Sequence, residues 1–413
     1  MKGFILLGMT LACCLCGARA DYYAAQGGQA PAYPYTTWAT AASNIQDAVN
    51  AASPNATVWV GAGRYTVPTN AVISDGGTNV IYLDKLLTLR GYSGIPEDTV
   101  IDGGGSNRGV AVYYNRDNFT NCFVLNGFTI TNCFAKSGGG IKLSPNTMTW
   151  TATVQNCVIT HNTSTDGDGA IDIYNAWNNK PWTLVASNVV IRDNGAVGLN
   201  TYPYFGENGG VRLTDCLIEK NLGGLNLWRG SNVVRNCVIR GNYKTAVGAG
   251  MYLAYGKHVF INCLFYNNAD VAATPAIIYT SYSVPEFYNC TIVSNSGRGL
   301  HAQTDKILVW NSIVYSNSAA NFTLTVNFTN SCVTPTNSTT GPGNITNYPR
   351  FVDFAGQDFR LAAESPCINR GLNQDWMAGA EDLGGRTRKD RFSGVVDLGC
   401  YEYHPQGLMF IVR

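Results

Sequence analysis

The sequence predicts an all-β chain whose short parallel strands stack as the coils of a solenoid. Three observations lead to this fold class. A seven-residue pattern recurs along the middle of the chain, its copies alternate apolar and polar residues, and no segment between copies has the apolar spacing of a helix. The composition agrees, because 45 glycines and only 13% charged residues are typical of a chain of strands and turns.

The seven-residue pattern is clearest in NCVITHN, which runs from Asn156 to Asn162. A fainter copy begins at Gly127, and the seven clear copies start 32, 27, 21, 26, 27 and 22 residues apart. A repeat of this length is one supersecondary unit that must stack on its neighbours to bury its apolar face. The later clear copies begin at Asn188, Asp215, Asn236, Asn262, Asn289 and Asn311.

Each position of the pattern has a physical role. The first is Asn or Asp, residue types that readily enter the left-handed conformation of a sharp bend. The second and fourth positions alternate with polar or variable ones, so each copy predicts a strand with one buried face. The seventh is always Asn, which ends the strand in a turn. The fourth positions should form one buried column of Ile159, Ile191, Ile218, Ile239, Phe265, Ile292 and Val314.

A second short strand, usually introduced by glycine, follows each copy. Examples are GGGIKL, which ends at Leu143, and GAGMYL, which ends at Leu253. A βαβ unit would need a crossover helix of about a dozen residues, and the sequence offers none. Units that lack helices stack as a parallel β-solenoid, in which each coil pairs with the next at roughly 4.8 Å.

The cysteines of the repeat follow the same logic. Taken alone, Cys157 and His161 in one copy suggest a metal site or a nucleophile with its base. Cysteine recurs at the same inward position of other copies, however, so a stack of small apolar residues is the favoured interpretation. His161 lies at a turn and should be exposed. The stack is expected to hold Cys157, Cys216, Cys237, Cys263 and Cys290.

These repeats resemble the right-handed parallel β-helix proteins of the pectate-lyase-like superfamily. The resemblance implies a ladder of stacked asparagines at one tight turn, which the first positions Asn156, Asn188, Asn236, Asn262, Asn289 and Asn311 would match. The Gly-Gly-Ile and Ile-x-x-Asn steps also resemble repeats of polymorphic outer-membrane adhesins. The tail from Ser365 to Tyr403 resembles the C-terminal region of choice-of-anchor Q domain proteins.

The ends of the chain predict four segments. Residues 1–20 resemble a signal peptide with Ala18-Arg19-Ala20 before the cleavage site, and a lipoprotein signal is the rival because three cysteines lie nearby. Residues 21–80 should form an N-terminal cap and the first strands, with a helix capped by Ser43. Residues 81–345 should form the β-helix coils, and residues 346–413 an irregular C-terminal cap. The helix should bury Ile45, Ala48, Val49 and Ala52.

Basic and acidic side chains are nearly equal in number, which limits the kinds of partner that the protein can attract by charge. With 28 basic and 27 acidic side chains the chain has no global field to attract nucleic acid or an acidic polymer, so any charge selectivity must be local. No further apolar run is long enough to span a membrane, so an exported, monomeric protein is expected. Export also permits disulfides, and Cys367 with Cys400 is the favoured pair.

One outward row of the glycine-led strands is the candidate binding surface. Amides can bond sugar hydroxyls, and the aromatic rings beside the row can stack on sugar faces. The alternative is that any outward face must be polar. The predicted row is Lys142, Asp172, Asn200, Asn226, Tyr252, Ile278 and His301, with Tyr174, Trp228 and Tyr255 beside it.

The tightest catalytic candidates are Lys142, Asp172 and Tyr174, next to a turn that carries Asp166 and Asp168. A lyase would use Lys142 and a Ca²⁺ bound by these carboxylates, whereas a hydrolase would use Asp172 and Asp168. The alternatives are a simple turn and a surface ion pair. The sequence therefore predicts a secreted polysaccharide-binding protein, with cleavage left open. A non-enzymatic adhesion or structural envelope protein is the rival class.

Overall fold

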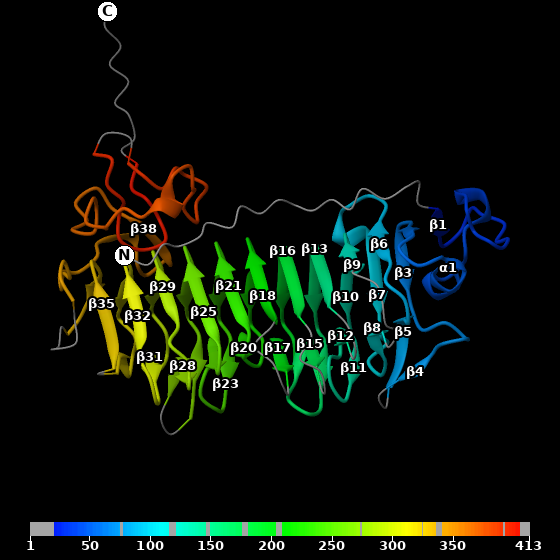
Figure 1. The fold of residues 1–413 in the computed structure, drawn as a ribbon, viewed down its shortest axis with the longest axis horizontal. Coiled ribbons are helices and arrows are strands. Elements are labelled where there is room, and N and C mark those ends of the chain that lie inside the picture. The colour runs from blue at the N-terminus through cyan, green and yellow to red at the C-terminus, as the bar shows by residue number, and fades with distance from the viewer. Residues whose placement is uncertain are drawn as a thin grey trace, which may run out of the picture.

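The computed structural model of the chain is a long parallel β-helix with small additions at each end (Figure 1). The structure describes residues 20–74, 77–114, 121–145, 149–175, 181–203, 209–272, 275–323, 325–335, 341–390 and 393–404. The predicted signal peptide therefore lies outside the described residues, apart from residue 20. The all-β solenoid predicted from the repeats is confirmed, since the pairings between coils are parallel.

Two long sheets form the wall of the β-helix. Within the described ranges, the larger sheet has 21 strands and the other has 11. The larger sheet contains β1 (Asp21–Ala24), β2 (Thr57–Val60), β3 (Gly63–Tyr65), β6 (Thr88–Gly91), β7 (Thr99–Asp102), β9 (Asn121–Asn126), β10 (Thr129–Thr131), β13 (Trp150–Thr160), β16 (Trp182–Arg192), β18 (Gly209–Thr214), β19 (Leu217–Glu219), β21 (Ser231–Arg235), β22 (Val238–Arg240), β25 (Lys257–Ile261), β26 (Leu264–Tyr266), β29 (Glu286–Tyr288), β30 (Thr291–Val293), β32 (Ile307–Trp310), β33 (Ile313–Tyr315), β35 (Val326–Thr329) and β36 (Cys332–Val333).

The second sheet collects the glycine-led strands, and we call it the second sheet throughout. It begins with an antiparallel hairpin of β4 and β5 and then continues as parallel pairs. Its strands are β4 (Ile73–Ser74), β5 (Gly77–Leu83), β8 (Arg108–Tyr114), β12 (Ile141–Pro145), β15 (Gly169–Asn175), β17 (Val197–Pro203), β20 (Leu225–Trp228), β24 (Met251–Ala254), β28 (Ala276–Ser281), β31 (Arg298–Ala302) and β34 (Ala320–Phe322). Short connecting pairs are β11 (Phe134–Ala135) with β14 (Thr163–Ser164) and β23 (Tyr243–Lys244) with β27 (Ala269–Asp270).

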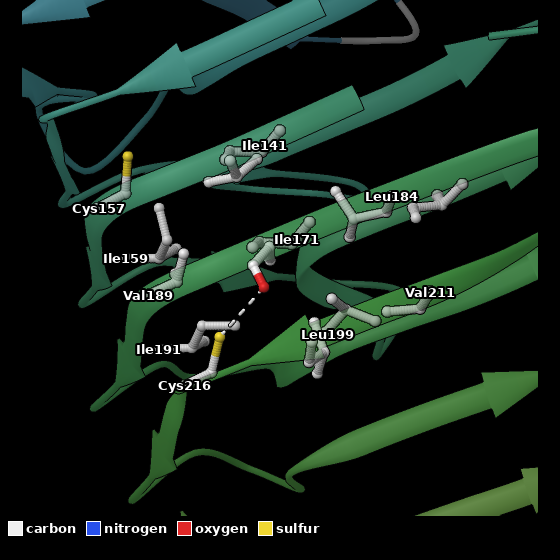
Figure 2. Packing of buried hydrophobic residues seen from close by; sticks show 14 of the residues in the cluster. Ile141, Cys157, Ile159, Ile171, Leu184, Val189, Ile191, Leu199, Val211 and Cys216 are labelled. Carbon is white, nitrogen blue, oxygen red and sulfur yellow. Dashed lines mark hydrogen bonds between the residues drawn. The ribbon is translucent and has the colours of Figure 1, made fainter. Parts of the chain in front are cut away.

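The buried column predicted from the fourth pattern positions is confirmed. Ile159 lies opposite Ile191, and Ile191 lies opposite Ile218. The same register continues coil by coil to Val314, and every member is fully buried. Side chains of both sheets meet in one core (Figure 2), so each coil contributes apolar residues from two directions.

Left-handed residues bend each coil at two points. The first pattern position has φ between 49° and 55° in all seven clear copies, as the sequence predicts. The sixth position has φ between 52° and 60°, so a second bend follows five residues later. Asn and Asp tolerate such angles better than most residues, which explains their use at the first position.

The main asparagine ladder lies at the seventh position, not at the first as the family resemblance implies. From Asn162 to Asn295, the side-chain Nδ2 of each seventh-position asparagine donates to Oδ1 of the seventh-position asparagine in the next coil at 2.8–3.1 Å. The same Oδ1 also accepts a hydrogen bond from the backbone N–H of the first asparagine, as Asn194 Oδ1 does from Asn162 N. Each Nδ2 also donates to the carbonyl of a column residue one coil back, as Asn194 does to Ile159. The buried ladder comprises Asn162, Asn194, Asn221, Asn242, Asn268, Asn295 and Asn317.

The first-position asparagines form a weaker and interrupted ladder. Asn188 donates to Asn156 at 2.8 Å, and Asn262 donates to Asn236 at 3.1 Å. Asp215 lies between these pairs and has no amide to donate. Sequence reasoning chose this row because both positions carry Asn, and periodicity alone does not say which of them faces inward.

We predict that the two ladders differ in their contribution to stability. Asn268→Ala should lower the free energy of unfolding by at least about 3 kcal/mol, because several buried groups lose partners at about 1–3 kcal/mol each. The control Asn188→Gly keeps the bend, removes an exposed amide and should cost about 1 kcal/mol or less. Urea unfolding followed by circular dichroism measures both. Equal losses would contradict the assignment of the main ladder.

The described cysteines lie mostly in the core, and none of them is in a disulfide. Cys157 and Cys216 point inward beside the isoleucine column (Figure 2), and Cys216 Sγ lies 3.7 Å from the Ala186 carbonyl oxygen. The ten described cysteines are all free. The predicted Cys367–Cys400 bridge is therefore wrong for this structure.

Packing explains why these two tail cysteines do not pair. The Cys367 thiol instead hydrogen-bonds with the Cys332 thiol of the last coil, and this contact together with burial raises the pKa of Cys332. Cys400 is buried elsewhere, against the coil of Cys263 and Cys290. Both tail cysteines thus belong to the interface between the tail and the β-helix.

We predict that thiol reactivity separates one cysteine from the rest. Cys122 is exposed, whereas Cys216, Cys237, Cys263 and Cys290 are buried. Native protein should therefore react with iodoacetamide at Cys122 within minutes, while the buried thiols react only after denaturation. Peptide mass spectrometry reads each site, and rapid native labelling of the stack would argue against a structural role.

The N-terminal helix closes the start of the β-helix. Helix α1 (Ile45–Ala51) is capped by Asn44, whose side chain accepts from the Asp47 N–H at 2.8 Å, and not by Ser43. The predicted apolar face is buried as expected. The Gln46 amide accepts from Tyr82 N and donates to Tyr82 O, which satisfies backbone groups of β5. Parallel pairing also starts earlier than residue 81, since β1 already pairs with β2.

The irregular C-terminal segment lies against the side of the last coils (Figure 1). It contains the antiparallel pair β37 (Phe351–Asp353) and β38 (Asp358–Leu361) and the short 3-10 turn Asp375–Met377. First-position asparagines hold it in place, since Asn262, Asn289 and Asn311 each donate to a backbone carbonyl of this segment. Its buried contacts are Phe351, Phe359, Leu361, Cys367, Leu398 and Cys400 against Leu264, Tyr266, Val293, Ile313 and Cys332.

A buried charge cluster organises the end of this segment. Arg388 and Glu402 are buried, with Arg388 Nε 3.1 Å from Glu402 Oε1. Burial raises the pKa of Glu402 to about 8 despite this cation, and Asp397 nearby adds to the rise. Asp397 accepts from the backbone N–H of Asn369 and Tyr403, which ties three parts of the tail together.

Candidate functional site

The outward row of the second sheet is close to the predicted one, with a correction at one coil. Lys142, Asp172 and Asn200 follow one another in register. In β28, however, Tyr279 occupies the row, and Ile278 is buried opposite Met251. No glycine introduces β28, and its first residues, Ala-Ile-Ile, do not alternate between apolar and polar. The sequence therefore does not indicate which residues of this strand face outward. The row in the structure is Lys142, Asp172, Asn200, Asn226, Tyr252, Tyr279 and His301.

Lys142 and Asp172 form an enclosed ion pair, not an exposed one. Their side chains are only 3% and 1% exposed. Lys142 Nζ contacts Asp172 Oδ2, donates to Ser137 Oγ at 2.7 Å and lies 4.9 Å from the centre of the Tyr174 ring. The turn before β12 folds over the pair. At Gly138, with φ of 59°, a Cβ would lie 3.1 Å from Lys142 Cα, so the turn approaches closely only because this residue is glycine.

A chain of side-chain hydrogen bonds extends from this pair along the row. Asp172 Oδ1 accepts from Asn200 at 2.7 Å, and Asn200 Oδ1 accepts from Asn226 at 2.7 Å. Asn226 Oδ1 in turn accepts from Trp228 Nε1 at 2.8 Å. Since each amide has a fixed donor and acceptor, the chain fixes the orientation of the Trp228 ring.

Aromatic side chains form two rows that share Trp228: the first runs beside the polar chain from Tyr174 onward, and the second begins at Trp228, where the polar chain ends. Tyr202 and Trp228 have ring centres 5.4 Å apart, and Tyr255 and Tyr282 stack at 4.9 Å with planes 8° apart. In the second row, Tyr279 stacks on His301 at 5.1 Å. We call these residues the aromatic surface: Tyr174, Tyr202, Trp228, Tyr255 and Tyr282 in the first row, and Trp228, Tyr252, Tyr279 and His301 in the second.

The tyrosines of the first row are exposed to solvent, whereas Trp228 and the second row are half-buried. Tyr174, Tyr202 and Tyr255 are 38%, 41% and 36% exposed, and Tyr282 is 57% exposed. Such large exposed rings are unusual unless they serve an interaction. Neighbouring rings come from neighbouring coils, so their spacing follows the coil spacing of roughly 4.8 Å.

Three cations accompany the rings. Lys244 Nζ lies 5.9 Å from the Tyr252 ring centre, and Arg229 lies 5.2 Å from that of Tyr255. Arg298 Nη1 is 2.7 Å from His301 Nδ1. Burial lowers the pKa of Lys244, and burial followed by the charge of Arg298 lowers the pKa of His301.

Sequence reasoning missed Tyr202, Tyr279, Tyr282 and the three cations. One signal for the tyrosines was available. The segments YLAY from Tyr252 to Tyr255 and YTSY from Tyr279 to Tyr282 have the same spacing. Aligning them places Tyr279, and not Ile278, in the outward row. Nothing comparable marks the cations, because Arg229 lies in a turn, Lys244 in the short connecting strand β23 and Arg298 at the start of β31.

The predicted calcium ligands lie in an exposed turn. Asp166 is 3.8 Å from Lys136 Nζ, and the Asp168 backbone carbonyl accepts from Ser164 Oγ at 2.7 Å. The described part of the chain contains no group of three or more His, Cys, Asp or Glu side chains arranged to hold a metal. Calcium requires six to eight oxygen ligands, so these two residues do not fit such an ion by themselves.

We predict that the buried pair of Lys142 and Asp172 stabilises the fold beneath the aromatic surface. Lys142→Met and Asp172→Asn should each cost about 3–5 kcal/mol of unfolding free energy, since each leaves a buried group without its partner. The double variant Lys142→Met with Asp172→Leu should be milder than the sum. Urea unfolding measures all three. Native stability in both single variants would contradict the enclosed pair.

Comparisons with known proteins agree on the fold. Residues 108–284 match the family model described as a right handed beta helix region. The crystal structure of pectate lyase Pel9A superimposes with a TM-score of 0.53 at 15% identity, covering 94% of this chain and 97% of that one. No curated protein sequence matches significantly. The chain thus has a right-handed parallel β-helix fold, as its repeats predict.

These comparisons leave the finer resemblances as predictions. At 15% identity the likeness to the lyase concerns the fold alone. The choice-of-anchor Q and adhesin resemblances rest on the quoted residues. Among the residues that the structure describes, no helix is long and apolar enough to cross a membrane.

Proposed function

We propose that this protein binds an extended polysaccharide along the aromatic surface. The observation that carries the proposal is the continuity of the rings, which follow one another at 4.9–6.5 Å over successive coils. One coil is close to the length of one sugar unit in an extended chain, so each coil presents a ring to one sugar. Sugar faces stack on aromatic rings, and the adjoining amides and cations bond sugar oxygens.

The polar part of the row supports this surface. The chain from Lys142 through Asn200 to Trp228 ends on the indole N–H and holds the ring that both rows share. A ring that is already held in place loses less conformational entropy on binding. Lys142, Asp172 and Asn200 therefore act as positioning residues, and Asn226, Trp228, Tyr252, Tyr255 and His301 as binding residues.

Cleavage is the second candidate function, and one observation favours it. Lys244 lies over the aromatic surface, and burial lowers its pKa. A lysine with a lowered pKa can act as a general base toward the α-proton of a uronate in a lyase reaction. Lys244 is better placed for this than Lys142, which is enclosed. Export through the predicted signal peptide would bring the protein to such polymers.

Binding should depend on the shared ring. Trp228→Ala should weaken polysaccharide binding about tenfold or more, and Tyr282→Ala about three- to tenfold, as expected for loss of one or two stacking contacts. Trp310→Ala is a matched control, because Trp310 stacks on Tyr288 at 4.8 Å on the larger sheet. Affinity electrophoresis against a panel of acidic and neutral polysaccharides gives the relative affinities.

The same panel tests cleavage through absorbance at 235 nm and new reducing ends. Turnover that is lost in Lys244→Met but kept in Arg192→Gln would establish the lyase candidate. Unchanged binding in the Trp228 variant, or equal loss in the Trp310 control, would refute the proposed binding surface.

A further inference from the structure

A shallow cavity that is largely open to solvent lies beside the last ring of the second aromatic row. It has a volume of about 460 Å³ and is lined by Arg298, Ala302, Ala320, Phe322, Thr323 and Thr325. These residues come from β31, from β34 and from the turn that follows β34. Arg298 lines this cavity and also contacts His301, the last ring of the row, so the cavity adjoins the end of the row.

Arg298 brings a positive charge that the protein itself does not neutralise. Its Nη1 contacts His301 Nδ1 at 2.7 Å. No carboxylate among the described residues lies within ion-pair distance of its guanidinium, whereas Arg240 and Arg388 each have such a partner. A guanidinium without a carboxylate can bind a carboxylate or sulfate group with two parallel hydrogen bonds.

His301 adds a donor to this charge. Its Nδ1 lies next to a guanidinium, which can only donate, so Nδ1 accepts and the ring proton is on Nε2. Burial and the charge of Arg298 both lower the pKa of His301, which keeps the ring neutral at neutral pH. The imidazole therefore presents one N–H and a flat face that already stacks on Tyr279.

Threonine hydroxyls and a phenyl ring complete the lining. Thr323 Oγ1 accepts from Ala302 N at 3.2 Å and lies 3.3 Å from Thr325 Oγ1. Phe322 is partly exposed and packs edge-on against Phe328 at 4.9 Å. A cation, hydroxyls and an apolar ring in one cavity match the mixed surface of a sugar that carries an acidic group.

We propose that this cavity is a subsite for one sugar unit that bears an anionic group, either a carboxylate or a sulfate ester. Arg298 binds the anion, the threonine hydroxyls bond ring hydroxyls, and Phe322 contacts the apolar edge of the sugar. This inference rests on the proposed function, because the second aromatic row delivers the chain to the cavity. It adds that the polymer is acidic and that the acid is recognised at this end of the row.

The test compares matched polymers that differ only in charge. Full-length mature protein is assayed by affinity electrophoresis on alginate, on carboxyl-reduced alginate, on dextran sulfate and on dextran. Wild-type protein should bind one of the two anionic polymers at least about tenfold more tightly than its neutral counterpart. Which pair shows this preference identifies the anion as carboxylate or sulfate.

Variants then test whether Arg298 causes the preference for the charged polymer. Arg298→Gln should reduce it to less than about twofold while leaving affinity for the neutral polymer unchanged. Arg298→Lys should retain part of the preference, and Arg192→Gln on the larger sheet should retain all of it. Circular dichroism melting confirms that each variant is folded.

The failures of the two proposals are distinguishable. A preference that persists in Arg298→Gln, or wild-type protein that binds neutral and charged polymers equally well, overturns the subsite and leaves the binding surface intact. Absence of binding to all four polymers, in wild-type protein and in Trp228→Ala alike, overturns both proposals.

Discussion

The buried asparagine ladder is the interaction on which the rest of this β-helix depends. Backbone pairing sets the distance between coils, but it does not stop one coil from sliding by a residue along the next, which would turn every side chain to the other face. Each ladder side chain bonds the coil before it and the coil after it, and these contacts are shielded from water. A slip would leave several of these buried groups without partners.

Register held in this way explains why like residues stack along the whole molecule. The apolar column is mostly isoleucine, the row that holds the thiols is mostly cysteine, and Asn200 pairs with Asn226, so similar residues recur from coil to coil. The aromatic surface is the solvent-facing case of the same rule. Because each coil repeats the geometry of the last, neighbouring rings of the first row lie 4.9–6.5 Å apart, which is the basis of the proposed binding of a polymer with a regular repeat.

The solvent exposure of the outward row changes along the axis of the β-helix. Near Lys142 the preceding turn folds over the row and encloses charged residues, whereas near Tyr282 the rings are open. The two parts are joined by hydrogen bonds that end on Trp228. Buried polar residues at one end of the row thus hold the exposed rings at the other end in position. The described part of the C-terminal segment lies against the larger sheet, where first-position asparagines bond its backbone.

The sequence predicted most of what repeats and missed most of what does not. Ile159 and its equivalents were placed correctly because alternation and period both mark them. The enclosure of Lys142 was missed because it depends on the turn around Gly138, whose length and sequence change from coil to coil. The ladder was assigned to the wrong asparagine, since Asn at a bend and Asn facing inward look alike in sequence. Arg298 was overlooked because its role depends on which carboxylates are absent around it.

The most direct test of the account is a crystal structure of the protein with an oligosaccharide of the polymer that binds best. The account predicts sugar rings stacked along Trp228, Tyr255 and Tyr282 with one sugar to each coil. An oligosaccharide seated on the larger sheet beside Tyr288 and Trp310, or crossing the coils with no relation to their spacing, would contradict it.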